Sequence, residues 1–360
     1  TIRVSFPTAA QAKGSAMAKK IYNSMNDFAA VCGISRPTLS KYFNDPTTVK
    51  EVTRKRIEAA LRKSNFEPNM FARHLNRKRT RNIGILVPTM SDPFYVQVVT
   101  LIELELRAKG YWPIQISCHS RPDLEEEAIR TLLAFKVAGA IVAPLGEPSQ
   151  PSVLQRLTDA IPVVCFDTPA SIDLPYVGND NVQSVAAMVQ YLCRSGEPPL
   201  FLEVPRVNEN SGERQNSYRA TMVKEGHSPL VIDCDAPVSW EFERLGFEQM
   251  QRILGNGGLP GKTVLCANDR FAFGAMAAAC QAGLKIGRGE NCDIRIAGHD
   301  DHPLSRYTCP SLTTMAQNAP EIAAKSVEIL LRRIDEVDEG KVSPARKLTL
   351  EATLMMRDSA

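Results

Sequence analysis

From about residue 83 to the end of the chain, short apolar runs alternate with longer stretches of helical periodicity. The runs are apolar at consecutive positions, whereas apolar residues in the longer stretches recur every three or four positions. Parallel strands that are buried on both faces, with helices covering the sheet, produce this pattern. The expected strands are residues 83–88, 111–117, 139–144, 162–167, 200–204, 229–234, 263–268 and 293–300.

These strands are too many for one sheet of average size, which holds about five or six strands. The regular spacing is interrupted after "YVGND", residues 176–180, and resumes near residue 200. We therefore predict two α/β lobes, with the chain passing from one to the other between residues 180 and 200. Two such lobes enclose a cleft that faces the carboxyl ends of their strands, where ligands of parallel sheets bind.

Residues 25–66 follow a different pattern, that of three short helices with turns at Gly33 and at Asp45-Pro46. Two closely crossing helices need a small residue at the crossing, a turn residue that tolerates positive φ, and apolar positions that hold the pair together. The positions that meet these needs are Ala29, Gly33, Ile34 and Leu39, and Phe28 with Tyr42 or Phe43 adds to the core. This region predicts a helix-turn-helix.

The second of these helices begins with an apparent helix breaker, Pro37. If Ser35 is the N-cap, Pro37 falls in the first turn, where backbone N–H groups have no intrahelical acceptor and a missing one costs nothing. The side chains pointing away from the apolar face are then Arg36, Pro37, Ser40, Lys41 and Asn44. Such a helix start can enter the major groove of DNA, with Ser35 and nearby N–H groups on phosphate. A helical hairpin with a solvated basic face is the alternative.

The distribution of charge also divides the chain near residue 82, where the helical region gives way to the α/β pattern. Residues 1–82 hold 17 lysines and arginines against 5 acidic residues, whereas residues 83–360 hold 26 against 35. A basic block joined to an acidic one indicates a polyanionic partner at the N-terminal end. Residues 67–82, rich in arginine and lysine, are expected to be a linker that also touches DNA. Residues 1–18 lack a pattern and are left out of the fold prediction.

Several classes of protein are not expected from the composition. No run of about 18 apolar residues predicts a membrane helix, and the N-terminus lacks the apolar core of a secretory signal. The nine cysteines are scattered singly, which favours free thiols in a reducing cytoplasm and predicts no metal site. No nucleophile–base arrangement or phosphate-binding glycine loop is visible, so we expect neither an enzyme nor a cofactor.

Two stretches carry a family resemblance: "DFAAVCGISRPTLSKYFN" and "VTRKRIEAALRKSNFEPNMFARHLNRKRTRNIGILVP". They resemble the lac repressor family (LacI/GalR type) of bacterial transcription regulators, and a looser similarity continues to "LEATLMMRDS" near the end. The resemblance implies an N-terminal all-α helix-turn-helix DNA-binding domain and a two-lobed parallel α/β sensor domain similar to periplasmic sugar-binding proteins. The implied domains are 19–66, a hinge at 67–82, and 83–360, with 1–18 as an extension.

The resemblance also implies which residues contact DNA. Base reading falls to Arg36, Pro37, Lys41 and Asn44. Residues 69–76 match a hinge helix that inserts a leucine into the minor groove, where such a wedge bends the duplex; the residues implied are Asn69, Ala72, Arg73 and Leu75. Two departures leave the operator sequence open. Phe66 stands where a tyrosine is common, and Lys41 offers one flexible donor in place of arginine's planar fork.

In the two-lobed region the resemblance implies an effector pocket at the strand ends. Aspartate, arginine, amide and aromatic side chains suit a ring that carries vicinal hydroxyls. The implied residues are Asp92, Phe94, Tyr95, Asp167, Arg214, Trp240, Asn268, Asp300 and Gln317. Some alternatives stay open: Asp180, Asn181 and Asp269 could cap helices, Trp240 could belong to the core, and His299 is expected to be packed.

The prediction is a cytoplasmic, homodimeric regulator that represses transcription at a pseudo-palindromic operator under control of a small carbohydrate-like effector. No heptad tail follows the last apparent strand, so a dimer is expected rather than a tetramer. A purine, polyol or sugar-acid effector and an activator role are the alternatives within the family. A periplasmic-type sugar-binding protein is the rival outside it.

Overall fold

The computed structural model describes residues 24–64, 66, 80–146, 148–341 and 343–360. The chain divides into two compact units, Thr1–Thr80 and Arg81–Ala360.

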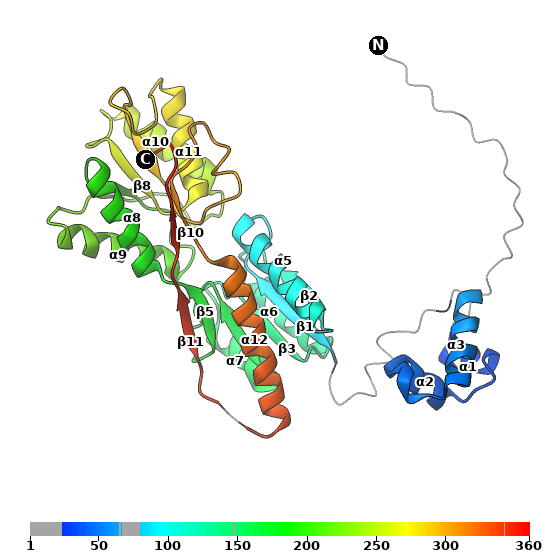
Figure 1. Cartoon of the computed structure of the whole chain (residues 1–360). Coiled ribbons are helices and arrows are strands. Elements are labelled where there is room, and N and C mark those ends of the chain that lie inside the picture. The colour runs from blue at the N-terminus through cyan, green and yellow to red at the C-terminus, as the bar shows by residue number, and fades with distance from the viewer. Residues whose placement is uncertain (1–23, 65, 67–79, 147, 342) are drawn as a thin grey trace, which may run out of the picture. The chain divides into compact units, whose positions relative to one another are not determined.

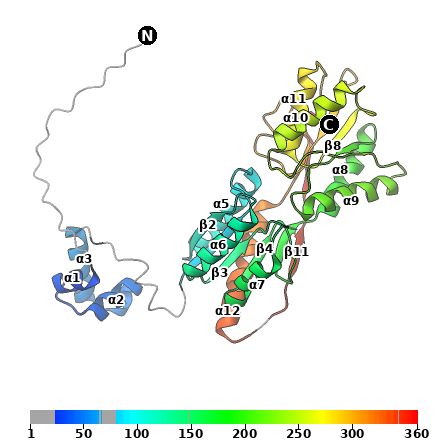
Figure 2. The same cartoon turned by 180° about the vertical axis from the view of Figure 1, so that it is seen from behind.

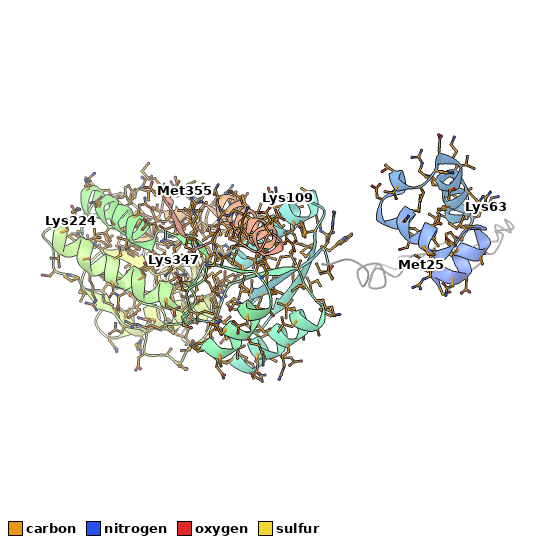
Figure 3. The ribbon with its side chains drawn as sticks, turned by 90° about the horizontal axis from the view of Figure 1, so that it is seen from below. Met25, Lys63, Lys109, Lys224, Lys347 and Met355 are labelled. Carbon is orange, nitrogen blue, oxygen red and sulfur yellow. The ribbon has the colours of Figure 1, made fainter. Side chains whose placement is uncertain are left out.

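The first unit contains the three predicted helices, α1 (Met25–Val31), α2 (Arg36–Asn44) and α3 (Glu51–Lys63), with a 3-10 turn at Pro46–Thr48. Met25 and Lys63 mark its first and last helical residues in Figure 3. Gly33 lies in the left-handed region with φ of 60°, as the turn requires. Ser35 is the N-cap of α2, and Pro37 lies in the first turn. The predicted helix start is therefore confirmed.

The core of the first unit is small. Phe28, Leu39 and Ile57 are fully buried, and Phe66 stacks on Phe28 with ring centroids 4.3 Å apart. Ala29, Cys32 and Tyr42 complete the cluster, whereas Ile34 and Phe43 are only partly buried against it. Burial of Phe66 explains why a phenylalanine serves at this position, since its ring belongs to the core.

The first lobe of the second unit is built on a six-stranded parallel sheet, in the order β11-β5-β4-β3-β1-β2. Helices α5 and α12 pack on one face and α6 and α7 on the other, as the two hydrophobic clusters show (Figure 1 and Figure 2). The elements are β1 (Asn82–Val87), α5 (Pro93–Ala108), β2 (Trp112–Ser117), α6 (Pro122–Ala134), β3 (Gly139–Val142), α7 (Pro151–Ala160), β4 (Val163–Phe166), β5 (Tyr176–Asn179), α12 (Ala319–Asp338) and β11 (Lys347–Leu350).

The second lobe has a four-stranded parallel sheet in the order β7-β6-β8-β9, and a separate antiparallel pair, β10 with β12. Its elements are α8 (Asn181–Ser195), β6 (Leu200–Leu202), α9 (Glu209–Lys224), β7 (Val231–Ile232), α10 (Phe242–Gly255), β8 (Thr263–Cys266), α11 (Asp269–Gln281), β9 (Arg295–Ala297), β10 (Thr314–Ala316) and β12 (Thr353–Met355). No helix within the described ranges is both long and apolar enough to cross a membrane.

The predicted two parallel sheets are confirmed, but the lobes are not consecutive segments. The chain crosses between them three times: from β5 to α8, from β10 to α12, and from β11 to β12 (Figure 1). The sequence pattern misses the second and third crossings because β10, β11 and β12 are only three or four residues long. The pattern also overestimates the length of two strands. Of the predicted residues 229–234 only Val231–Ile232 form a strand, and of 293–300 only Arg295–Ala297.

Candidate functional site

A cavity lies between the two lobes of the second unit, at the carboxyl ends of both parallel sheets. Asp92 and Asp167 follow β1 and β4 of the first lobe, whereas Asn268 and Asp300 follow β8 and β9 of the second. All nine residues predicted for the effector pocket line this one cavity: Asp92, Phe94, Tyr95, Asp167, Arg214, Trp240, Asn268, Asp300 and Gln317. The structure thus brings the predicted set together, while its role in binding stays a prediction.

Arg214 organises the second-lobe side of the cavity from helix α9. Its guanidinium donates from Nε to Asn181 Oδ1 (3.0 Å), from Nη1 to the carbonyl of Ala267 (2.9 Å) and from Nη2 to Asp300 Oδ1 (3.0 Å). Gln317 also donates to Asp300 Oδ1, at 2.7 Å. Burial acts to raise the pKa of Asp300, but the Arg214 guanidinium and the hydrogen bonds from His299 and Gln317 together outweigh it and hold that pKa below the usual value. Asp300 is therefore a fixed carboxylate acceptor facing the cavity.

Asp167 occupies the first-lobe side in a different environment. The Tyr95 hydroxyl donates to its Oδ2 (2.7 Å), and the Asn210 amide of the second lobe donates to its Oδ1 (3.0 Å). Burial raises the pKa of Asp167 to about 6, although the hydrogen bond from Tyr95 acts to lower it. Its backbone φ of 62° lies in the left-handed region, which turns this side chain toward the neighbouring lobe. Asp167 thus connects the lobes through a hydrogen bond.

Asp92 is shared between a helix cap and an ion pair. Its Oδ1 accepts the backbone N–H of Phe94 at the start of α5 (2.9 Å), and its Oδ2 lies 3.1 Å from Nη1 of Arg270 on α11. Arg270 is not among the residues predicted from the sequence. Its position directly after the strand-end pair Asn268–Asp269 was the available signal, because the first turn of a helix after a buried strand faces the cleft.

Aromatic rings form one wall of the cavity. The Tyr95 ring centroid lies 5.6 Å from that of Phe94 and 5.9 Å from that of Trp240. Trp240 also packs against the hydrophobic cores of both lobes. The two alternatives for Trp240, pocket and core, are therefore both true of the same side chain.

Of the three residues that could cap helices, the structure shows one, Asp180, in that role. Asp180 caps α8 and Asn268 caps α11 through their side-chain oxygens. The capping hypothesis for Asp269 is wrong: its carboxylate accepts from Ser305, Thr314 and the N–H of His302. These bonds tie α11 to the segments around β10, because a fully buried carboxylate requires donors on several sides.

His299 is packed, as predicted, but it also joins a hydrogen-bonded chain that the sequence did not reveal. Its Nδ1 lies 2.9 Å from Asp300 Oδ1 and its Nε2 lies 2.8 Å from Ser184 Oγ. Burial lowers the pKa of His299 to about 4, so the imidazole is neutral near pH 7. Since a carboxylate only accepts, Nδ1 carries the proton and Nε2 accepts from Ser184. Ser184 is fully buried, so this chain orients Asp300 and offers no exposed nucleophile.

Several other residues of the cavity were not predicted from the sequence. They come from the segment that leads into α9 and from its first turn, and from the start of α10: Val204, Val207, Asn208, Asn210, Ser211 and Phe242. No sequence signal marks the first of these segments, because it reaches the cavity only through the packing of α9. Among the residues that the structure describes, no three metal-ligating side chains are grouped to hold an ion.

The candidate nucleic-acid surface is the first turn and outer face of α2. Arg36, Pro37 and Lys41 are exposed there and Ser40 is half-buried. Neither Arg36 nor Lys41 forms an ion pair with another described residue, whereas Lys55 and Arg54 on α3 pair with Glu51 and Glu58. The remaining predicted contacts, the Asn44 side chain and residues Asn69, Ala72, Arg73 and Leu75, lie outside what the structure describes.

The chain combines a helical unit that has an exposed basic helix start with a two-lobed unit that has a cavity between its lobes. These two features define the class of protein as a regulator. Residues 24–69 match the family described as bacterial regulatory proteins, lacI family. Residues 80–301 match the family described as periplasmic binding proteins and sugar binding domain of LacI family. The chain belongs to the LacI family, which confirms the resemblance seen in the sequence.

Individual relatives agree with this placement over nearly the whole chain. The ribose operon repressor of Escherichia coli (strain K12) is 28% identical over 342 residues, 94% of this chain and 99% of the relative. The HTH-type transcriptional repressor PurR of Haemophilus influenzae (strain PittEE) is 26% identical, over 93% and 98%. The crystal structure of the lac repressor dimer bound to operator and the anti-inducer ONPF shares the fold, with a TM-score of 0.80 and 24% identity over 94% and 98% of the two chains.

Proposed function

We propose that this protein is a cytoplasmic, dimeric transcriptional repressor that binds a pseudo-palindromic operator through α2 and responds to a small neutral effector in the interlobe cavity. The single observation that carries the proposal is the convergence of nine polar and aromatic residues, from both lobes, on one cavity in a chain that also bears a helix-turn-helix. A change in the arrangement of the lobes on effector binding would bias the arrangement of two subunits on DNA.

The helix start of α2 supports the DNA-binding part. A dimer of such units places two recognition helices in successive major grooves, so the preferred duplex has two related half-sites. Exposed Arg36 and Lys41 are available to base edges or phosphates because no described acidic side chain neutralises them.

We expect selection from a pool of random DNA duplexes to return a pseudo-palindromic sequence. Replacing Lys41 by alanine should relax the preference at one symmetric pair of positions and weaken binding by about 1–3 kcal/mol. The matched control is Lys55→Ala on α3, whose ammonium pairs with Glu51 and which should retain wild-type selection. Selected sequences without symmetry, or equal effects of the two substitutions, would contradict the proposed mode of binding.

Ser35 allows helix capping to be separated from phosphate binding. Its hydroxyl accepts the N–H of Thr38 at 3.4 Å, so Ser35→Ala should lower the stability of the first unit by about 0.5–2 kcal/mol. Ser35→Asp keeps a capping oxygen but adds a negative charge that repels phosphate. We therefore expect Ser35→Asp to melt like wild type and to bind the selected duplex more weakly, as measured by calorimetry and gel shift. Wild-type DNA affinity of Ser35→Asp would exclude a phosphate next to this helix start.

The chemistry of the cavity supports a neutral, hydroxyl-rich effector. Three carboxylates, Asp92, Asp167 and Asp300, line it, and two guanidinium groups neutralise two of them: Arg214 pairs with Asp300 and Arg270 pairs with Asp92. A ligand carboxylate or phosphate would face net negative charge, so a sugar acid is disfavoured. Hydroxyl groups can donate to the aspartates, and the faces of Phe94 and Trp240 can cover an apolar ring face. A small carbohydrate or polyol fits these demands.

The rival classes receive less support. A periplasmic-type sugar-binding protein would leave the helix-turn-helix without a role. A hydrolase that acted through the Ser184–His299–Asp300 chain would need an accessible serine, whereas Ser184 is fully buried. We propose no catalytic activity for the chain, and the test is the duplex selection described above.

A further inference from the structure

Arg270 forms a cluster of charges that joins the two lobes. From α11 of the second lobe its Nη1 lies 3.1 Å from Oδ2 of Asp92 in the first lobe. Its Nε and Nη2 donate to Oε1 and Oε2 of Glu243 on α10 of its own lobe, each at 2.7 Å. One planar guanidinium is thus held in a two-point fork by Glu243 and presented to a carboxylate of the opposite lobe.

The surroundings make this cross-lobe contact stronger than a surface ion pair. The side chains of Arg270 and Asp92 are only 12% and 13% exposed, so solvent screens them weakly. The guanidinium carbon also lies 5.2 Å from the ring centroid of Phe242, a residue that lines the cavity. Asp92 is fixed as well, because its other oxygen caps α5. Both partners are therefore held in place before they meet.

The position of the contact matters for opening of the lobes. Asp92 caps the start of α5 in the first lobe, and Arg270 lies in the first turn of α11 in the second lobe. Neither residue belongs to a segment in which the chain crosses between the lobes, so their attraction holds the lobes together in addition to the covalent connections. The cavity that both lobes line is small, about 50 Å³, which is room for about three to five water molecules at about 10–15 Å³ each. Separation of the lobes would widen it for a larger ligand.

We propose that the Asp92–Arg270 ion pair, braced by Glu243, is a latch that holds the cleft closed without an effector. This inference rests on the proposed function only in naming the ligand an effector. It means that effector entry requires the latch to break, and that Asp92, predicted from the sequence to be an effector contact, acts chiefly in closing the cleft. The balance between open and closed lobes is then set by the latch as well as by the ligand.

Trp240 provides a measurement that needs neither DNA nor effector. The chain has two tryptophans, so Trp112→Phe leaves Trp240 as the single reporter, in contact with Tyr95 of the first lobe. In this background, Arg270→Gln should raise the acrylamide quenching constant of Trp240 fluorescence about twofold, because opening uncovers the face that packs on the first lobe. Asp92→Asn, which retains a good helix cap, should give the same rise, and the double variant should add little to either.

The matched control is Arg244→Gln on α10 of the same lobe. Arg244 pairs with Glu241 and Glu248 within its own helix, so its loss should leave the quenching constant unchanged. The latch is refuted if Arg270→Gln matches the control, or if the Asp92 and Arg270 effects add in full. Should Arg270→Gln fail to fold, Asp92→Asn decides alone: a rise supports the latch and an unchanged constant refutes it. Failure of the duplex selection would refute the proposed function and leave this measurement standing.

Discussion

Replacing Arg214 by methionine is expected to lower the free energy of unfolding of the second unit by about 3–5 kcal/mol, the usual cost of removing one partner from a buried ion pair. Arg214 is 8% exposed, and its loss leaves the carboxylate of Asp300 with donors from His299 and Gln317 alone. The carbonyl of Ala267 and the amide oxygen of Asn181 lose a donor at the same time. The measurement is urea or thermal unfolding of the full chain.

The same substitution is expected to abolish the effector response. A screen of pentoses, hexoses, polyols, sugar acids and nucleobases identifies the compound that raises the melting temperature of the wild-type protein most, since a ligand of the folded state stabilises it. Arg214→Met should show no rise with that compound. Arg214→Lys keeps the positive charge but loses the planar guanidinium that donates to three acceptors. Compared with Arg214→Met, it should therefore recover part of the stability and little of the effector response.

The control for this experiment is Arg219→Met on the same helix, where the side chain is exposed. It should unfold like wild type and keep the full melting-temperature shift. If Arg214→Met kept the shift, the cavity would not be the effector site. If Arg219→Met lost it as well, the effect would come from helix α9 as a whole.

Replacing Leu39 by alanine is expected to unfold the first unit and to abolish DNA binding. Leu39 is fully buried in a cluster of only seven buried residues, and Leu→Ala in a core costs about 2–5 kcal/mol. A unit with so small a core has little stability in reserve. Calorimetry should show that its transition is lost while that of the second unit stays at the wild-type temperature, and gel shift should show no complex with the selected duplex.

Val52→Ala is the matched control for Leu39→Ala. Val52 lies on α3 of the same unit with 75% of its surface exposed, so truncation removes few contacts and both transitions should persist. Loss of the effector-induced melting shift in Leu39→Ala would contradict the independence of the two units, because the cavity residues all belong to the second one.

Most of the effector cavity could be predicted because parallel sheets place their functional side chains at strand ends. Positions that follow β1, β4, β8 and β9 can be read from the apolar runs that precede them, and four of the residues that the family resemblance implies hold such positions: Asp92, Asp167, Asn268 and Asp300. Arg214 and Gln317 came from the family resemblance. The segment around Asn208 and Asn210 was missed, since it has neither a strand before it nor a distinctive composition.

The interpretation of single side chains was less successful than their placement. Asp92 reads from the sequence as a hydroxyl acceptor, yet in the structure one oxygen caps α5 and the other meets Arg270 from a segment 178 residues away in the chain. His299 reads as a packing residue, yet it orients Asp300 through a bond to Ser184, 115 residues distant. Partners so far apart in sequence leave no local signal.

The sequence by itself determined the class of the protein. Periodicity separated three short helices from two parallel sheets, charge placed the basic surface on the helical part, and the helix start at Ser35 to Pro37 followed from capping and proline chemistry. Such features are local, because they depend on residues a few positions apart. Only the tertiary structure decided the three crossings between lobes, the fixed carboxylate of Asp300 and the Asp92–Arg270 contact. These depend on which distant segments meet, and buried charges are satisfied only by the partners that folding brings to them.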